Sequence, residues 1–213
     1  GVRVHTRHRW TGRSATAGTL RFETRDGPVE AAAAAWILAL GGASWPKLGS
    51  DGAWVRLLEE RGVDVAPLRP SNCGFDVERW SEHFRGRHAG APLKTVTLTV
   101  GPEAAPRFRR RGEFVVTQTG IEGSLVYAAS AAINAAIEQE GRAQVFIDLL
   151  PDRSLAFVRA ELERPRGPRS LSTHLKSRLG LDGVKAGLLR EGTAGELDAD
   201  PGTLARRIKS LPL

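Results

Sequence analysis

The sequence predicts an α+β fold, with strand-rich sequence first and helical sequence last. The first forty residues begin with the alternating "VRVHTRHRW", contain an Asp-Gly turn and end in an apolar run. The middle holds "LKTVTLTV", the cleanest alternation in the chain, and the last third is a series of short amphipathic segments bounded by glycine and proline. A period of two is typical of strands, and a period of 3.6 is typical of helices.

The N-terminal region predicts a β-meander followed by a strand, a glycine turn and a helix. "VRVHTRHRW" and "GTLRFETRDG" are expected to be strands, and Asp26-Gly27 is expected to form a tight turn. "VEAAAAAWILAL" should continue from that turn and end as a strand over residues 36–40. The segment "DGAWVRLLEERGV" predicts a helix that Asp51 can cap and Gly62 ends. Such a unit is typical of the phosphate or cofactor edge of an α/β sheet.

The middle region predicts further strands around one long helix. "PLRPSNCGFDV" is interpreted as a crossover between domains, and "VERWSEHF" as a short helix. "RFRRRGEFVVTQTG" is expected to be a hairpin-like pair around Arg111-Gly112, and "QVFIDLL" another strand. "SLVYAASAAINAAIEQEG" predicts a helix that ends at Gly141. The expected core members are Leu93, Val96, Leu98, Phe114, Val116, Phe146 and Ile147.

The last third predicts four short helices. The first should be capped by Asp152 and should stop before Pro165. Two more, "RSLSTHLKSRLG" and "DGVKAGLLREG", are separated by glycines. The last begins with Pro201 at a first-turn position, where a missing N–H costs nothing.

Composition bounds the class of protein. The 213 residues carry a net charge of +7, and arginine greatly outnumbers lysine. Arginine suits phosphate contacts, but a GC-rich coding bias explains the excess as well, and we favour that explanation. No apolar run approaches the length of a membrane helix. The single cysteine, Cys73, excludes an intrachain disulfide and suits a cytoplasmic location. The chain lacks methionine and starts at Gly1 in strand-like sequence, so we expect a piece of a longer polypeptide.

No self-contained catalytic motif is present. The five histidines lack metal-ligand spacing with Cys73, so no metal site is predicted, and His83 and His88 are interpreted as surface residues. Cys73 is interpreted as a buried or incidental thiol. The run Arg107–Arg111 could bind phosphate groups, but we favour its interpretation as a solvated hairpin.

Two glycine-rich turns are the candidate binding elements. In the first, "WILALGGASWPKLGSDG", an apolar run ends at two glycines, which carry no side chain. In the second, "GEFVVTQTGIEGSLVYAAS", a predicted strand ends at a glycine-rich turn that leads directly into a predicted helix. Backbone amides at such turns can approach a planar or anionic ligand. Ordinary turn glycines would explain the same residues.

The two turns, together with the later "PLRPS" and the terminal "ARRIKSLPL", resemble one family. They are similar to BaiN-like flavoproteins, which include aminoacetone-oxidase-like enzymes, and the similarity spans most of the chain in order. Members show A-T-G-G-x-S-Y-P, P-L-x-P and T-H-T-G-x-S-G-P. Five positions depart from this pattern. Leu40 replaces threonine, Trp45 replaces tyrosine, Glu122 replaces serine and Ser124 replaces proline. Gln118 replaces histidine, which removes the obvious ring base and leaves the catalytic residues unknown.

The resemblance implies a fragment of an FAD-dependent oxidoreductase that acts on a small-molecule substrate. Residues 1–66 would be a partial, Rossmann-like FAD-binding domain. Residues 67–213 would be an inserted substrate-side domain, with a β-barrel over about 67–150 and the C-terminal end, and a helical lobe over about 151–195. The N-terminal G-x-G-x-x-G and C-terminal parts of the FAD domain would be missing, so the isolated chain should be inactive. The implied cofactor-binding residues are Trp10, Ala39, Gly41, Gly42, Thr119 and Gly120.

FAD is the implied cofactor, with NAD(P) as a possible second one and no membrane partner. Two alternatives stay open: a basic module that binds nucleic acid through Arg107–Arg111, and a purely structural or interaction domain.

Overall fold

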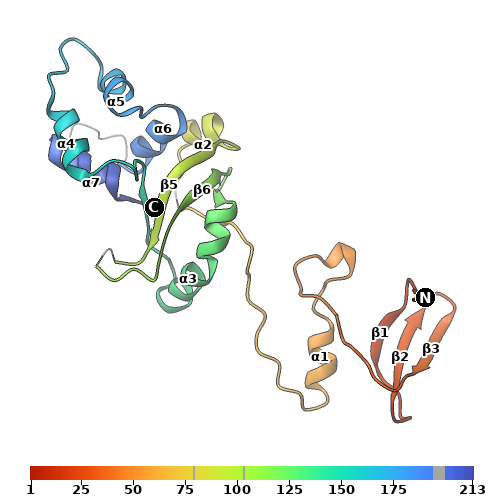
Figure 1. Ribbon diagram of the computed structural model, residues 1–213. Helices are drawn as coiled ribbons and strands as arrows, with labels where there is room; N and C mark the ends of the chain where they lie inside the picture. The colour runs from red at the N-terminus through yellow and green to blue at the C-terminus, as the bar shows by residue number, and fades with distance from the viewer. Residues whose placement is uncertain (79, 103, 194–199) are drawn as a thin grey trace. The chain divides into compact units, whose positions relative to one another are not determined.

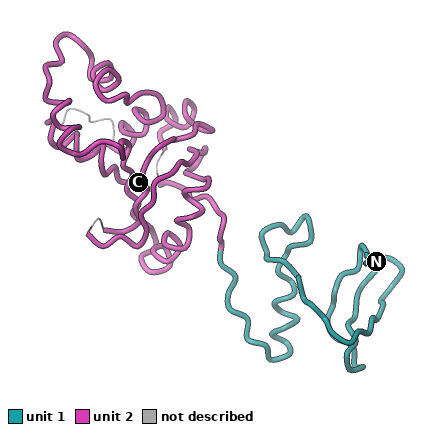
Figure 2. Tube along the Cα trace, in the orientation of Figure 1, with its two compact units in different colours: residues 1–69 teal, residues 70–213 magenta. Residues whose placement is uncertain are grey.

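The computed structural model has an α+β fold and describes residues 1–78, 80–102, 104–193 and 200–213. The chain divides into two compact units, Gly1–Arg69 and Pro70–Leu213, which Figure 2 distinguishes by colour. The first is called unit 1 below and the second unit 2, and each is described by itself.

Unit 1 is a small antiparallel meander followed by two short helices. Its strands lie in the order β1-β2-β3 (Figure 1), and the expected Asp26-Gly27 turn joins β2 to β3, with Gly27 at a φ of 110°. The elements are β1 (Arg9–Arg13), β2 (Thr19–Thr24), β3 (Gly27–Ala32), the 3-10 helix η1 (Pro46–Leu48) and α1 (Trp54–Glu59). Asp51 Oδ1 accepts a hydrogen bond from the Ala53 amide just before α1.

The predicted strand over residues 36–40 is wrong for this structure. The chain leaves β3 after Ala32 and runs on without strand pairing, and Ile37 is 93% exposed. The predicted first strand is also shorter, because Val2 and Val4 lie outside β1 and are exposed. Apolar and β-branched side chains favour extended backbone, but a strand also needs a neighbour to accept its hydrogen bonds.

Unit 2 is built on a curled six-stranded antiparallel sheet, a half-barrel, with the strand order β4-β7-β6-β5-β8-β9. The strands are β4 (Phe75–Asp76), β5 (Pro92–Val100), β6 (Phe108–Val116), β7 (Gly120–Glu122), β8 (Val145–Asp148) and β9 (Leu211–Pro212). The expected break at Arg111-Gly112 is wrong, because β6 runs through both residues. The turn lies earlier, between β5 and β6.

Helices cover the sheet from two sides. Figure 1 shows α3 beside β6, with the lobe of α4 to α7 on the other side of the β5–β6 pair. The helices are α2 (Glu82–His88), α3 (Ser124–Glu140), α4 (Leu155–Glu163), α5 (Leu171–Leu179), α6 (Gly183–Glu191) and α7 (Pro201–Lys209).

The helix ends show which sequence signals operate. Gly141 ends α3 in the left-handed conformation, and Pro201 opens α7, both as predicted. Asp152 does not cap α4. The Ser154 hydroxyl caps it instead, by accepting a hydrogen bond from the Phe157 amide. A serine directly before the first turn reaches the N3 amide, whereas a residue two positions earlier lies outside the helix.

The core of unit 2 lies between the concave sheet, α3 and the helical lobe. Six of the seven predicted core residues are buried, while Phe146 is only half-buried because it alternates with the buried Ile147 on β8. The strand β9 completes the sheet at the chain's end, where Leu213 and Val145 exchange hydrogen bonds of 2.8 and 3.1 Å.

Candidate functional site

The structure places the predicted binding residues on both units. Trp10, Ala39, Gly41 and Gly42 belong to unit 1, whereas Thr119 and Gly120 belong to unit 2. Each set is therefore considered with its own surroundings.

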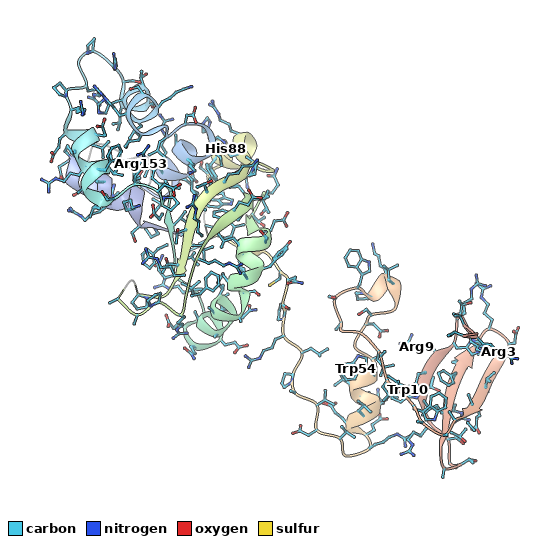
Figure 3. All side chains as sticks on the ribbon, in the orientation of Figure 1. Arg3, Arg9, Trp10, Trp54, His88 and Arg153 are labelled. Carbon is cyan, nitrogen blue, oxygen red and sulfur yellow. The ribbon has the colours of Figure 1, made fainter. Side chains whose placement is uncertain are left out.

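Trp10 lines an open cleft of about 520 Å³ in unit 1 that also contains Arg7, Arg9, Asp51 and Trp54. Figure 3 labels Arg9, Trp10 and Trp54, which come from β1 and α1. Trp10 Nε1 donates to the Gly12 carbonyl at 2.8 Å, and Arg9 pairs with Asp51 at 2.9 Å. Indole rings together with guanidinium groups suit a ligand that has a planar ring system and phosphates.

Asp51 is held as a carboxylate at the edge of this cleft. The hydrogen bond from the Ala53 amide, assisted by the charge of Arg9, lowers the pKa of Asp51 below its ordinary value. Asp51 thus orients the Arg9 guanidinium and neutralises one of the cleft's cations. The sequence analysis assigned Asp51 only to a helix cap, and it did not name Arg7, Arg9 or Trp54 as site residues.

Ala39 and Gly41 line a second, apolar groove of about 420 Å³ with Leu38, Trp54 and Leu58. Trp54 Nε1 donates to the Gly41 carbonyl at 3.1 Å and so fixes this segment on α1. Gly41 has a φ of 70°, which requires glycine or costs strain. Gly42 is different, because a Cβ built on it would meet no atom within 4 Å.

Thr119 and Gly120 form a tight turn between β6 and β7. The Thr117 amide donates to the Gly120 carbonyl at 2.8 Å, and the Thr119 hydroxyl donates to Asp76 Oδ1. A Cβ on Gly120 would lie 1.9 Å from the Phe75 carbonyl oxygen, so close pairing with β4 already requires this glycine. The exposed residues of the turn are Gln118 and Thr119, and these are the ones that a ligand could reach.

Trp80 supports the turn through a hydrogen bond and through ring packing. Its Nε1 donates to the Gly120 carbonyl at 3.3 Å, and its ring packs on Phe84, which in turn packs on His88. His88 is buried rather than at the surface as predicted, and burial, with the nearby charges of Arg87 and His83, lowers its pKa. His174 is also buried. His88 packs on Phe84 of its own helix and also lies against Gly187 of α6, and this second contact has no local sequence signal.

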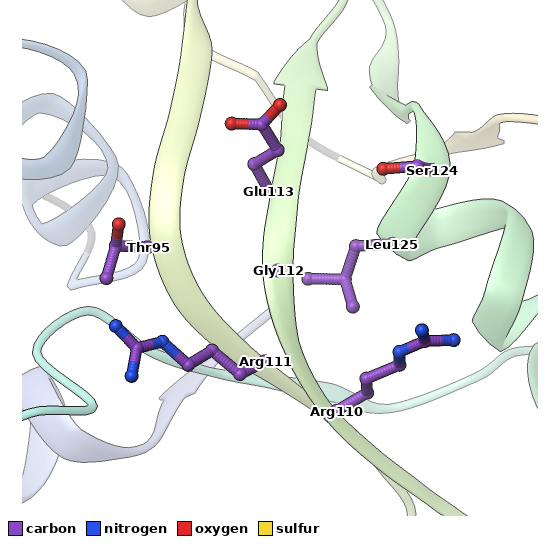
Figure 4. Close-up of a pocket in the computed structure, with 7 residues that line it drawn as sticks. All are labelled: Thr95, Arg110, Arg111, Gly112, Glu113, Ser124 and Leu125. Carbon is purple, nitrogen blue, oxygen red and sulfur yellow. The ribbon is translucent and has the colours of Figure 1, made fainter.

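The arginine run over residues 107–111 does not form one continuous basic face. Arg111 makes two bonds to Asp152, at 2.7 and 2.9 Å, and Arg107 bonds Gln139. Figure 4 shows Arg110 and Arg111 extending to different sides of the strand, in a groove of about 580 Å³ that includes Ser124. This arrangement gives no specific support to a nucleic-acid interface.

Two features are absent from the part of the chain that the structure describes. No group of three or more histidine, cysteine, aspartate or glutamate side chains is placed to hold a metal ion. None of the described helices combines the length and the apolar character that a membrane crossing needs.

The half-barrel with its helical lobe and the meander with its aromatic and cationic cleft make this an α+β protein of two units. Residues 69–213 match the family described as "HI0933-like protein barrel and H2TH domain". The match covers more than half of the chain, so the chain belongs to this family, which is related to FAD-dependent flavoprotein oxidoreductases. No curated protein matches the chain.

Proposed function

We propose that the chain is a segment of an FAD-dependent oxidoreductase of the BaiN-like, aminoacetone-oxidase-like group. Residues 1–66 would contribute part of the FAD-binding domain, and residues 67–213 would be the substrate-side insert. The family match carries the proposal, because it covers the barrel and helical lobe that the resemblance assigns to that insert. FAD would supply the electron transfer, and the protein would supply position and electrostatics.

The cleft of unit 1 supports FAD as the ligand. Trp10 and Trp54 offer flat apolar surface, and Arg7 offers charge for phosphate oxygens. Asp51 keeps Arg9 in place through their 2.9 Å ion pair. No observation on either unit supports NAD(P) as a second cofactor, and the comparisons do not support it either.

The exposed apolar surface of unit 1 supports its assignment as part of a larger domain. Within residues 1–69, all of which the structure describes, Leu20 is the only large apolar side chain that is buried. Trp36, Ile37 and Leu38 are all exposed and follow β3 after three alanines. A unit this small is marginal even with a compact core, so we infer that this apolar segment packs against further FAD-domain sequence.

Equilibrium dialysis of the 213-residue chain against FAD tests the proposal. We expect micromolar or weaker binding, since part of a cleft must order itself and the ligand for a fraction of the contacts. Trp10→Ala should weaken that binding about fivefold or more, by loss of ring stacking. Trp45→Ala is the matched control, because Trp45 is exposed and does not line the cleft.

Two results would contradict the proposal. One is the absence of measurable FAD binding at millimolar ligand. The other is binding that Trp10→Ala and Trp45→Ala affect equally, because the cleft would then play no part in it. A stoichiometric complex that survives gel filtration would instead show that these residues hold the whole site.

A further inference from the structure

The seam of the half-barrel contains a groove that the proposed flavin site does not use. The sheet curls so that the β4 segment and the β8–β9 pair both line this groove, and α3 contributes a third wall. Its volume is about 790 Å³. This size falls within the range typical of small-molecule pockets, roughly 300–1,000 Å³.

The walls of the groove combine apolar side chains with charged and amide groups. Ile121 comes from β7 and Val145 from β8, the strands next to the two sheet edges, and Ile133 and Ile137 come from successive turns of α3. Ile137 is 38% exposed, one of three large apolar side chains exposed in the described part of unit 2. An apolar body placed between these side chains would remove Ile137 from water, which is favourable in proportion to the area covered.

One polar group of the groove stands out by its lack of a partner. Arg142, on the connection from α3 to β8, makes no hydrogen bond or ion pair within the described part of the chain. The other polar groups are engaged: Asp76 accepts the Thr119 hydroxyl, and Gln144 donates to the Leu213 carbonyl at 2.9 Å. Asp76 and Glu78 lie on the β4 side, so the charge that favours an anion is on the Arg142 side.

The edge strand β9 disfavours an added β-strand as the occupant. Its Leu211 pairs with Ile147 on β8. The intervening residue is Pro212, which has no N–H to donate to a further strand. A small molecule needs no such ladder of backbone donors.

We propose that this groove binds a small amphipathic anion, with its apolar body between the α3 isoleucines and the sheet and its carboxylate at Arg142. The inference does not depend on flavin binding. Its test contains no flavin, so its failure and a failure of the proposed function can be told apart.

Isothermal titration calorimetry of the 213-residue chain with octanoate, octanol and octylammonium tests the proposal. The three probes share an apolar chain and differ in the head group. We expect octanoate to bind at least about tenfold more tightly than octanol, because a charge-assisted pair with Arg142 adds to the same apolar contact. Octylammonium should bind no better than octanol.

Paired variants locate the site. Arg142→Gln should weaken octanoate about tenfold and leave octanol unchanged, whereas Ile137→Ser should weaken both. Arg110→Gln removes the same charge from the other groove of unit 2, and Leu38→Ser alters the apolar groove of unit 1; both should leave octanoate binding unchanged. Arg142, Ile137, Arg110 and Leu38 are all exposed, so these four variants should fold.

The proposal is overturned if octanoate fails to bind, if octylammonium binds more tightly than octanoate, or if Arg142→Gln has no effect. Loss of binding in Leu38→Ser or Arg110→Gln would place the octanoate elsewhere and would also overturn it. Displacement of octanoate by an extended apolar peptide that carries no acidic group would show that strand addition occurs after all.

Discussion

Gly120→Ala should destabilise unit 2 strongly, for a reason that is independent of any cofactor. The added Cβ would lie 1.9 Å from the Phe75 carbonyl oxygen and 2.7 Å from the Asp76 Cα, whereas ordinary contacts lie at 3.4–4 Å. Both obstacles are backbone atoms, so no side-chain rotation relieves the overlap. The β4 segment must therefore move away from β7 by more than 1.4 Å.

The size of the effect follows from the interactions that such a shift breaks. The Val77 amide donates to the Thr119 carbonyl at 2.8 Å, and Trp80 Nε1 donates to the Gly120 carbonyl at 3.3 Å. Each hydrogen bond contributes about 0.5–1.5 kcal/mol net, and overpacking at a fixed site adds about 1–3 kcal/mol. We expect the free energy of unfolding to fall by about 3 kcal/mol.

Urea unfolding followed by far-UV circular dichroism measures this change. The helical signal reports mainly on unit 2, because unit 1 has only the short α1 and η1. Gly86→Ala is the matched control: Gly86 lies inside α2, and its added Cβ would meet no atom within 4 Å. That variant should be neutral or more stable by up to about 1 kcal/mol. Equal midpoints for Gly120→Ala and the unchanged protein would refute the reasoning.

Three further predictions concern the packing of the helical lobe. Gly187→Ala should lower the free energy of unfolding by about 1–3 kcal/mol, since its Cβ would lie 2.4 Å from His88 Nε2. Gly183→Ala at the start of α6 is the control in urea unfolding: its Cβ meets no atom, and its φ of 52° should cost less stability than the clash at Gly187. Lys185→Met should lower the free energy of unfolding by about 2 kcal/mol in the same assay, because Nζ donates to the Thr95 and Leu149 carbonyls at 2.9 and 2.7 Å and the variant leaves both carbonyls unpaired. A fall below about 0.5 kcal/mol would contradict this. Burial lowers the pKa of His88, so the unfolded state binds a proton at this side chain more readily than the folded state does. The stability that His88 contributes is complete above about pH 6.5 and should be lost as the pH falls below it. A pH series of unfolding midpoints should show a shallower loss in His88→Leu, and identical slopes would exclude this contribution of His88.

Much of the fold could be predicted because strong local signals agreed with the tertiary structure. The strand β5 alternates without interruption, and α3 combines high helix propensity with a glycine at its C-cap. Residues 36–40 carry an equally strong apolar signal, yet they form no strand here. Local sequence specifies extended backbone, but the partner strand is a property of the whole sheet.

The role of each glycine is hard to predict from the sequence alone. Gly112 suggested a turn, but it lies within β6, where a Cβ would come 3.2 Å from Leu125 on α3. The glycine is consistent with close approach of the helix to the strand. Such contacts join residues that are distant in sequence, and a glycine gives no local sign of whether it serves a turn, a packed neighbour or a ligand.

This ambiguity decides which residues can test the proposed flavin site. Gly120 is required by β4, and Gly41 by its positive φ, so alanine at either position would disturb the fold whether or not a cofactor binds. Gly42 has neither constraint within unit 1, and loss of FAD binding in Gly42→Ala would therefore be informative. Trp10 and Arg9 are better probes still, because their side chains line the cleft. A substitution that removes a ligand contact without straining the backbone separates the effect on binding from the effect on stability.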